Sequence, residues 1–224
     1  PTRDLLQAYG IEDRLLKPLP IGTSVASFYP DSDARTILRR SWGASDQDIV
    51  LIYTGKHNRN KKPHLVYEAA LSIEFPNNGK VLMVTVGPVD QQYFVDECEV
   101  PLGRLSEKGV IVIRVPTVPA EELRKYYSAA DIAVFPAEST LSSLDAMACG
   151  LPVVMQDDAI NRHRLEVGGR VFEAGSVTHL ADCLKELIAD REVRQEMGLR
   201  SISDMKERFC YQSIEVIISQ CDRR

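Results

Sequence analysis

The chain has no apolar run that approaches the ~20 residues needed to cross a bilayer. Its first residues also lack the basic stretch and apolar run that mark a secretory signal. Internal repeats and low-complexity segments are absent as well. We therefore expect a soluble protein of the cytoplasm, in which 224 residues bury one substantial core with a small appendage.

Metal-ligand spacings and paired cysteines are missing too. The five cysteines are an odd number without paired spacing, which favours reduced thiols over a disulfide framework or a zinc site. The four histidines show no ligand spacing with one another or with the cysteines, so we expect no bound metal. A net charge of -5 argues against nonspecific nucleic-acid binding, although cations cluster in one local segment.

Apolar, β-rich runs alternate with helical patterns along the chain. The runs are continuous rather than alternating in polarity, which indicates strands covered by helices on both faces. Expected strands lie at 49–53, 81–86, 110–113, 132–135, 152–155 and 170–172. Expected helices lie at 5–9, 63–73, 91–98, 120–129, 140–149, 177–189, 192–209 and 211–220. The fold class is therefore predicted as α/β, a Rossmann-like parallel sheet with helices on both faces.

The segment 135–154 carries the clearest chemical signal. A Ser/Thr-rich turn after a buried strand supplies N-cap side chains for the helix 140–149, and Gly150 and Pro152 end it. At helical spacing, Asp145 lies on one face together with Ser142 and Cys149, and is expected to point away from the core. The opposite face, expected to lie on the sheet, carries Leu141, Leu144 and Ala148.

The run Leu144-Asp-Ala-Met-Ala-Cys-Gly-Leu-Pro-Val-Val154 resembles the Leu-Glu-Ala-Met-Ala-Cys-Gly-x-Pro-Val-Val signature of the group 1 (family 4) retaining glycosyltransferases, which have the two-domain GT-B fold. Asp145 stands where the family has its second Glu. The resemblance implies that its carboxylate accepts hydrogen bonds from the ribose hydroxyls of a nucleotide sugar. The alternative is an exposed acid that serves only solubility.

The family carries a first Glu eight positions before the second, whereas Glu138 lies seven positions before Asp145. We interpret the difference as a loop shortened by one residue. The resemblance implies that Glu138 lies near the donor sugar or its phosphates in a catalytic role, and that the amides of Ser139, Thr140 and Leu141 cradle a phosphate oxygen. Alternatively, Glu138 caps the helix and complements its dipole.

A basic turn follows the first expected strand. Gly55 permits a tight turn, and Lys56, Arg59, Lys61 and Lys62 concentrate positive charge, which favours an anion. In the family, a Gly-Arg pair and a Lys five positions beyond the Arg contact the donor diphosphate. Lys56 and Lys61 stand at those two places, which implies that they stabilise the leaving diphosphate, although Lys lacks the Arg fork. The alternative is a solvated basic turn, with Arg59 and Lys62 as surface charges.

The stretch 114–131 resembles the family segment whose loop lies beside the nucleobase. The resemblance implies that backbone groups from Arg114 to Thr117 read the base. Arg114 could equally form an ion pair at the surface. The Gly87-Pro88 turn is expected near the ligand rather than in contact with it.

The stretch Leu19-Pro-Ile-Gly-Thr23 resembles Ile-Pro-Asn-Gly-Val-Asp, which joins the two domains of the family. We therefore expect an interdomain connecting segment at 1–32, the nucleotide-sugar-binding domain at 33–206 and a C-terminal helix at 207–224. The resemblance covers nearly the whole chain but only about half of a complete enzyme. The expected partners are a nucleoside diphosphate sugar and an N-terminal acceptor-binding domain that this chain lacks.

The resemblance implies the donor-binding domain of a retaining hexosyltransferase that acts in glycan, glycolipid or polysaccharide biosynthesis. It implies no cofactor besides the donor substrate and no transfer by this domain alone. It leaves open whether the full-length enzyme associates with the inner face of the membrane. Two alternatives stay open: a non-catalytic nucleotide-sugar-binding or assembly module, and a nucleotide-sugar 2-epimerase, whose His-rich signature we do not find.

Overall fold

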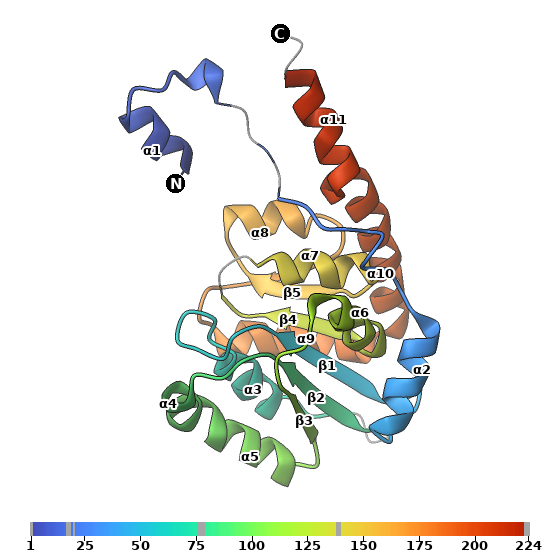
Figure 1. Cartoon of the computed structure of the whole chain (residues 1–224). Helices are drawn as coiled ribbons and strands as arrows, with labels where there is room; N and C mark the ends of the chain where they lie inside the picture. Colours follow the sequence, from blue (N-terminus) through green and yellow to red (C-terminus); the bar gives the residue numbers. More distant parts are fainter. Residues whose placement is uncertain (1, 17–18, 20, 76–78, 138–139, 222–224) are drawn as a thin grey trace.

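The fold is a six-stranded parallel sheet with helices on both faces (Figure 1), as the sequence predicts. The computed structural model describes residues 2–16, 19, 21–75, 79–137 and 140–221. The strands run in the order β3-β2-β1-β4-β5-β6. Their bounds are β1 (Ile49–Thr54), β2 (Val81–Val86), β3 (Ile111–Val115), β4 (Ile132–Phe135), β5 (Val153–Gln156) and β6 (Gly169–Phe172).

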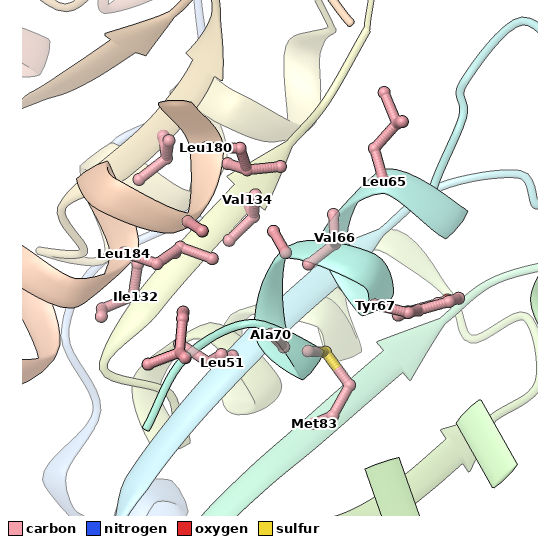
Figure 2. Packing of buried hydrophobic residues seen from close by; sticks show 14 of the residues in the cluster. Leu51, Leu65, Val66, Tyr67, Ala70, Met83, Ile132, Val134, Leu180 and Leu184 are labelled. Carbon is pink, nitrogen blue, oxygen red and sulfur yellow. The ribbon is translucent and has the colours of Figure 1, made fainter. Parts of the chain in front are cut away.

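The central apolar runs form strands that are covered on both faces. Every residue of β1, β2 and β4 is buried, and neighbouring side chains of one strand enter opposite cores. Leu51 packs in the core beneath α3 (His64–Leu71), α5 (Glu99–Glu107) and α9 (Val177–Ala189) (Figure 2). Ile52 packs in the second core beneath α6 (Ala120–Ala129), α7 (Leu141–Ala148) and the π-helical turn η3 (Met205–Phe209). Two apolar faces require an uninterrupted apolar strand.

The direction of the winding reverses beside β1. From β1 the chain builds β2 and then β3 on one side, and α6 carries it back so that β4 pairs with the other side of β1. Leu51 of β1 is in register with Ile132 of β4. The carboxyl ends of β1 and β4 are therefore neighbours at the point where parallel sheets open a crevice for ligands.

Several helices differ from the prediction. The expected helix at 91–98 consists of α4 (Gln91–Tyr93) and a π-helical turn, η2 (Phe94–Cys98), and then continues as α5. Pro101 lies in the first turn of α5, where a missing backbone donor costs little. The expected helix at 192–209 is divided into α10 (Arg191–Asp204) and η3.

Besides α5, two α-helices were not predicted, α2 (Ser32–Ser41) and α8 (Ala159–Arg164). Each begins after an aspartate N-cap: Asp31 accepts a hydrogen bond from Ala34 N at 2.9 Å, and Asp158 accepts one from Asn161 N at 2.8 Å. The remaining elements are α1 (Thr2–Ala8), the short 3₁₀ helix η1 (Asp13–Leu15) and α11 (Tyr211–Cys221). In Figure 1, α1 and η1 stand away from the sheet, and α11 extends from η3.

The segment that enters α2 is attached to the domain by specific contacts. Thr23 N donates to Phe209 O at 2.8 Å, and Phe28 is buried against the ring of Tyr127, with 6.3 Å between ring centroids. The domain boundaries at 32 and 206 stay a prediction. Among the described residues, no helix has the length and apolar character needed to span a membrane.

Candidate functional site

The motif segment and the basic turn meet at the reversal of the sheet. The basic turn leaves the carboxyl end of β1, and the turn before α7 leaves the carboxyl end of the adjacent strand β4. Two segments about 80 residues apart in sequence thus border the point at which such sheets open a crevice. This is the position in which doubly wound sheets bind nucleotides.

Helix α7 forms as the sequence predicts, from Leu141 to Ala148. Thr140 caps its first turn by accepting a hydrogen bond from Ser142 N at 3.3 Å, and Gly150 follows its end with φ 80°. Leu144 and Ala148 are buried, as expected. The prediction for Leu141 was wrong, because its side chain is 50% exposed. As the first helical residue, Leu141 points toward the amino end of α7 and past the sheet.

Asp145 is covered rather than exposed, which disfavours a purely solubilising role. It is half-buried, and Thr23 Oγ1 donates to its Oδ1 at 2.6 Å. Burial raises the pKa of Asp145 to about 6, against the lowering effect of the Thr23 hydrogen bond. A carboxylate held in this way at a crevice is a candidate acceptor for ligand hydroxyls.

Further polar side chains lie beside Asp145. Thr54, the last residue of β1, and Tyr127 of α6 share a hydrogen bond of 2.7 Å between their hydroxyl oxygens, and both are buried. Burial raises the pKa of Tyr127, and the charge of Asp145 raises it further. Sequence reasoning missed Thr23, Thr54 and Tyr127. A hydroxyl at the end of an otherwise apolar strand is a signal that could have indicated Thr54.

The basic turn is shaped by its backbone. Gly55 has φ 145°, and Tyr53 Oη donates to Lys56 O at 2.8 Å. Lys61 N donates to Asn58 Oδ1 at 3.0 Å, which closes the turn before α3. Lys56 is exposed, consistent with a charge available to a ligand. Arg59 behaves as the expected surface charge.

Arg59 is 66% exposed and pairs with two acids of η2, Asp96 at 3.0 Å and Glu97 at 3.3 Å. Its charge is therefore directed away from the crevice and toward a neighbouring turn. Lys62 is exposed and has φ 48°, a backbone conformation that is uncommon for residues other than glycine. The four cations of the turn thus differ in their surroundings.

A hollow of about 390 Å³ opens at the carboxyl ends of β2 and β3. Its lining comprises His57, Thr85, Gly87, Pro88, Val89, Arg114, Val115, Pro116 and Thr117. Arg114 is exposed and stacks over the Phe94 ring, 4.0 Å from its centroid, an arrangement that neither sequence interpretation anticipated. The backbone stretch expected to read a base therefore lines a hollow beside the crevice.

His57, which follows Lys56 in the basic turn, lines this hollow. It is 2% exposed, and its Nε2 lies 3.0 Å from Tyr67 Oη. Burial, and secondarily the charge of Arg114, lower the pKa of His57 to about 4, so the ring is neutral at physiological pH. His57 N donates to Pro88 O at 2.9 Å, which ties the two loops together.

Glu138 and Ser139 lie outside the described residues, so their predicted roles stay predictions. The adjoining Thr140 O accepts a hydrogen bond from Arg164 Nη1 at 3.0 Å. Arg164 is buried on α8 and was not found by sequence reasoning. It places one cation directly behind the turn that leads into α7.

Four cysteines, Cys98, Cys149, Cys183 and Cys210, are unpaired and buried. Burial raises the pKa of Cys149, which lies beside Asp145 and is therefore a neutral thiol. Within the described ranges, no group of three or more His, Cys, Asp or Glu side chains is arranged to hold a metal ion. The site is thus built from hydroxyls, lysines and one carboxylate.

Comparisons with known proteins identify the family of the chain. The family model of the group 1 glycosyl transferases matches residues 34–203. The D-inositol 3-phosphate glycosyltransferase of Geodermatophilus obscurus is 28% identical over 205 residues, which are 86% of this chain and 44% of that protein. The corresponding protein of Nocardia farcinica is 26% identical over 213 residues, 90% of this chain and 46% of that protein. The chain spans about half the length of these curated relatives.

The fold is also found in a solved structure. HepE of Anabaena, solved in complex with UDP, has a TM-score of 0.81 and 19% identity, over 98% of this chain and 60% of that chain. Its likeness supports the Rossmann-like fold. The family itself is shown by the matched stretch, which covers more than half of the chain: this protein belongs to the group 1 glycosyl transferases.

Proposed function

We propose that this chain is the donor-binding half of a retaining glycosyltransferase that transfers a sugar from a nucleoside diphosphate sugar to an acceptor. The observation that carries the proposal is the half-buried carboxylate of Asp145, held by Thr23 on the helix that follows β4, next to the strand that leads into the basic turn. A carboxylate and separate cations suit the two polar parts of a nucleotide, its ribose and its diphosphate. The family match favours this activity over a 2-epimerase.

The proposed ligand runs along the carboxyl edge of the sheet. Its diphosphate lies between the lysines of the basic turn, Lys56 and Lys61, and the amino end of α7. There the amide of Leu141, in the first helical position, has no intrahelical acceptor. The ribose hydroxyls donate to Asp145, and the base enters the hollow lined by residues 114–117.

Cleavage of the bond between the sugar and the diphosphate leaves negative charge on the departing diphosphate. In the proposed reaction, Lys56 and Lys61 stabilise that charge, and Glu138 positions the sugar. A front-face displacement lets the leaving phosphate oxygen take the proton of the acceptor hydroxyl, which retains the anomeric configuration. Such a reaction needs no protein nucleophile in this half and no cofactor beyond the donor.

UDP is the first nucleotide to test, because HepE, which shares this fold, was solved with UDP. We propose that the acceptor binds a second domain, since the chain spans 44% of its relative from Geodermatophilus obscurus. Transfer by this chain alone should then be absent. We place the reaction in the cytoplasm, where nucleotide sugars are available to the full-length enzyme.

The proposal is tested by calorimetric titration of the chain with UDP, GDP and ADP. We expect one nucleotide to bind selectively. Asp145→Ala should weaken its affinity by roughly 30-fold, because hydrogen bonds to a charged group contribute about 1.5–3 kcal/mol. Lys56→Ala should weaken it by roughly tenfold. Both variants remove side chains outside the two apolar cores, so their thermal unfolding should remain cooperative.

Arg59→Ala is the matched control for Lys56→Ala. It removes one cation from the same turn, but a cation that pairs with Asp96 and Glu97 instead of facing the crevice. Its nucleotide affinity should equal that of the wild type. Equal losses in both lysine and arginine variants would indicate only general electrostatic attraction. Undiminished affinity after Asp145→Ala would contradict the proposed ribose contact and favour a different binding mode.

A further inference from the structure

Thr23 is held in place by its own backbone. It is 2% exposed, its N–H donates to Phe209 O at 2.8 Å, and it forms a parallel bridge with Cys210. The preceding residue, Gly22, leaves no room for movement toward η3, because an added Cβ would lie 2.6 Å from Phe209 O. The position of the Thr23 hydroxyl is thus set by two segments far apart in the chain.

This fixed hydroxyl is directed at Asp145. Thr23 Oγ1 donates to Asp145 Oδ1 at 2.6 Å, across 122 residues of sequence. A side chain with two rotatable bonds can turn its carboxylate, and one strong hydrogen bond removes much of that freedom. The carboxylate is then oriented before any ligand arrives, which lowers the entropic cost of binding.

We infer that Thr23 is a positioning residue of the nucleotide site, which holds Oδ1 of Asp145 and leaves Oδ2 to accept the ribose hydroxyls. The inference rests on the proposed function, since it assigns a role in binding the same ribose. It adds that the segment entering α2 belongs to the site. Affinity therefore depends on a residue outside the motif segment and outside the basic turn.

The role of Thr23 can be tested by varying the pH, because it alters the pKa of Asp145. Burial is the main effect on Asp145 and raises its pKa to about 6, whereas the Thr23 hydrogen bond lowers it. The titratable groups that face Asp145 from the packed elements are Tyr127 of α6 and Cys149 at the end of α7. Burial raises the pKa of each, so both stay neutral between pH 5 and 8. The terminal phosphate of UDP also titrates near pH 6, but it does so alike in every variant, so a difference between variants in that window reports on Asp145.

Removal of the Thr23 hydroxyl should raise the pKa of Asp145 above 6, because the hydrogen bond favours the charged carboxylate. We would measure UDP affinity from pH 5 to 8 in wild type, Thr23→Val and Thr23→Ser. Valine keeps the branched shape without the donor, and serine keeps the donor. We expect the pH midpoint of affinity to move upward by about one unit in Thr23→Val, with a roughly tenfold loss at pH 7, and Thr23→Ser to restore both.

Ser24→Ala supplies the matched control. It removes a neighbouring hydroxyl of the same segment, one that bonds with Ser27 at 3.0 Å instead of Asp145. Its midpoint should equal that of wild type. A Thr23→Val variant that loses affinity equally at every pH, with its midpoint unchanged, would show a merely structural role and overturn the inference.

A second readout separates this inference from the proposed function. The carboxyl carbon of Asp145, identified by its absence in Asp145→Asn, can be titrated by ¹³C NMR without nucleotide. An upward shift of its pKa in Thr23→Val supports the hydrogen bond, and an unchanged pKa overturns it. If the wild type binds none of UDP, GDP and ADP, the proposed function fails for this chain. The NMR titration would still decide whether Thr23 holds the carboxylate of Asp145.

Discussion

The acidic and the basic sides of the crevice are built in opposite ways. Asp145 is half-buried and receives a side-chain hydrogen bond from Thr23, a residue of a distant segment. Lys56 is exposed, and the turn that carries it is shaped through backbone contacts such as Tyr53 Oη to Lys56 O. The contrast suggests that the acid supplies fixed geometry, whereas the lysines supply charge that solvent can screen. Changes of fold, pH and salt should therefore affect the two sides differently.

The largest expected effect on stability comes from a substitution that distorts the backbone supporting the basic turn. Gly87 has φ 139°, and an added Cβ would lie 2.3 Å from Gly55 O, so Gly87→Ala forces the loops after β1 and β2 apart. We expect a loss of about 3 kcal/mol in the free energy of unfolding, from backbone strain and the clash together. Urea unfolding of the variant measures this.

Gly103→Ala is the control for that substitution. Gly103 lies within α5, and an added Cβ there meets nothing within 4 Å. Alanine should stabilise the helix by about 0.5–1 kcal/mol. A Gly87→Ala variant as stable as Gly103→Ala would show that the two loops are not held as tightly as the contact implies.

The next largest effect concerns Asp145, whose substitution should raise the free energy of unfolding instead of lowering it. Burial raises the pKa of Asp145 from 3.8 to about 6, so the folded state binds the proton more tightly than the unfolded state. The ionised carboxylate therefore destabilises the fold above pH 6. Asp145→Asn should raise the free energy of unfolding by about 1–2 kcal/mol at pH 7.5, after allowance for its remaining hydration. The gain should shrink as the pH falls through 6 and should vanish only below 3.8, where the acid is protonated in both states.

Asp157→Asn tests whether the gain in stability occurs only where the carboxylate is buried. Hydrogen bonding with Arg162 lowers the pKa of Asp157, so its ionised form stabilises the fold. Asparagine at 157 should lower stability at pH 7.5 instead of raising it. If Asp145→Asn also lowered stability at pH 7.5, the carboxylate would be better compensated than its raised pKa implies. The comparison between a covered acid and an exposed lysine would then lose its basis.

The sequence was most informative about features that local pattern determines. The six strands follow from apolar runs, most clearly in β1, β2 and β4, whose residues are all buried, and α7 follows from the Thr140 cap and Gly150. Helix α2 was missed because its apolar residues are few and its burial depends on α6. Thr23 could not be predicted as a partner of Asp145, since 122 residues separate them and only the tertiary fold brings them together. Long-range polar contacts leave no periodic trace in a sequence.

The smallest expected effect concerns salt and is measured on nucleotide affinity. An exposed cation is screened by added ions, so the loss caused by Lys56→Ala should shrink from roughly tenfold at 0.05 M salt to about twofold at 0.5 M. The loss caused by Asp145→Ala should change little, because a hydrogen bond in a half-buried site is screened weakly. Arg59→Ala should show no loss at either salt concentration. If both losses shrank in parallel, Asp145 would act on the ligand through its charge rather than through a fixed contact, and the acidic side would not be the preorganised half of the crevice.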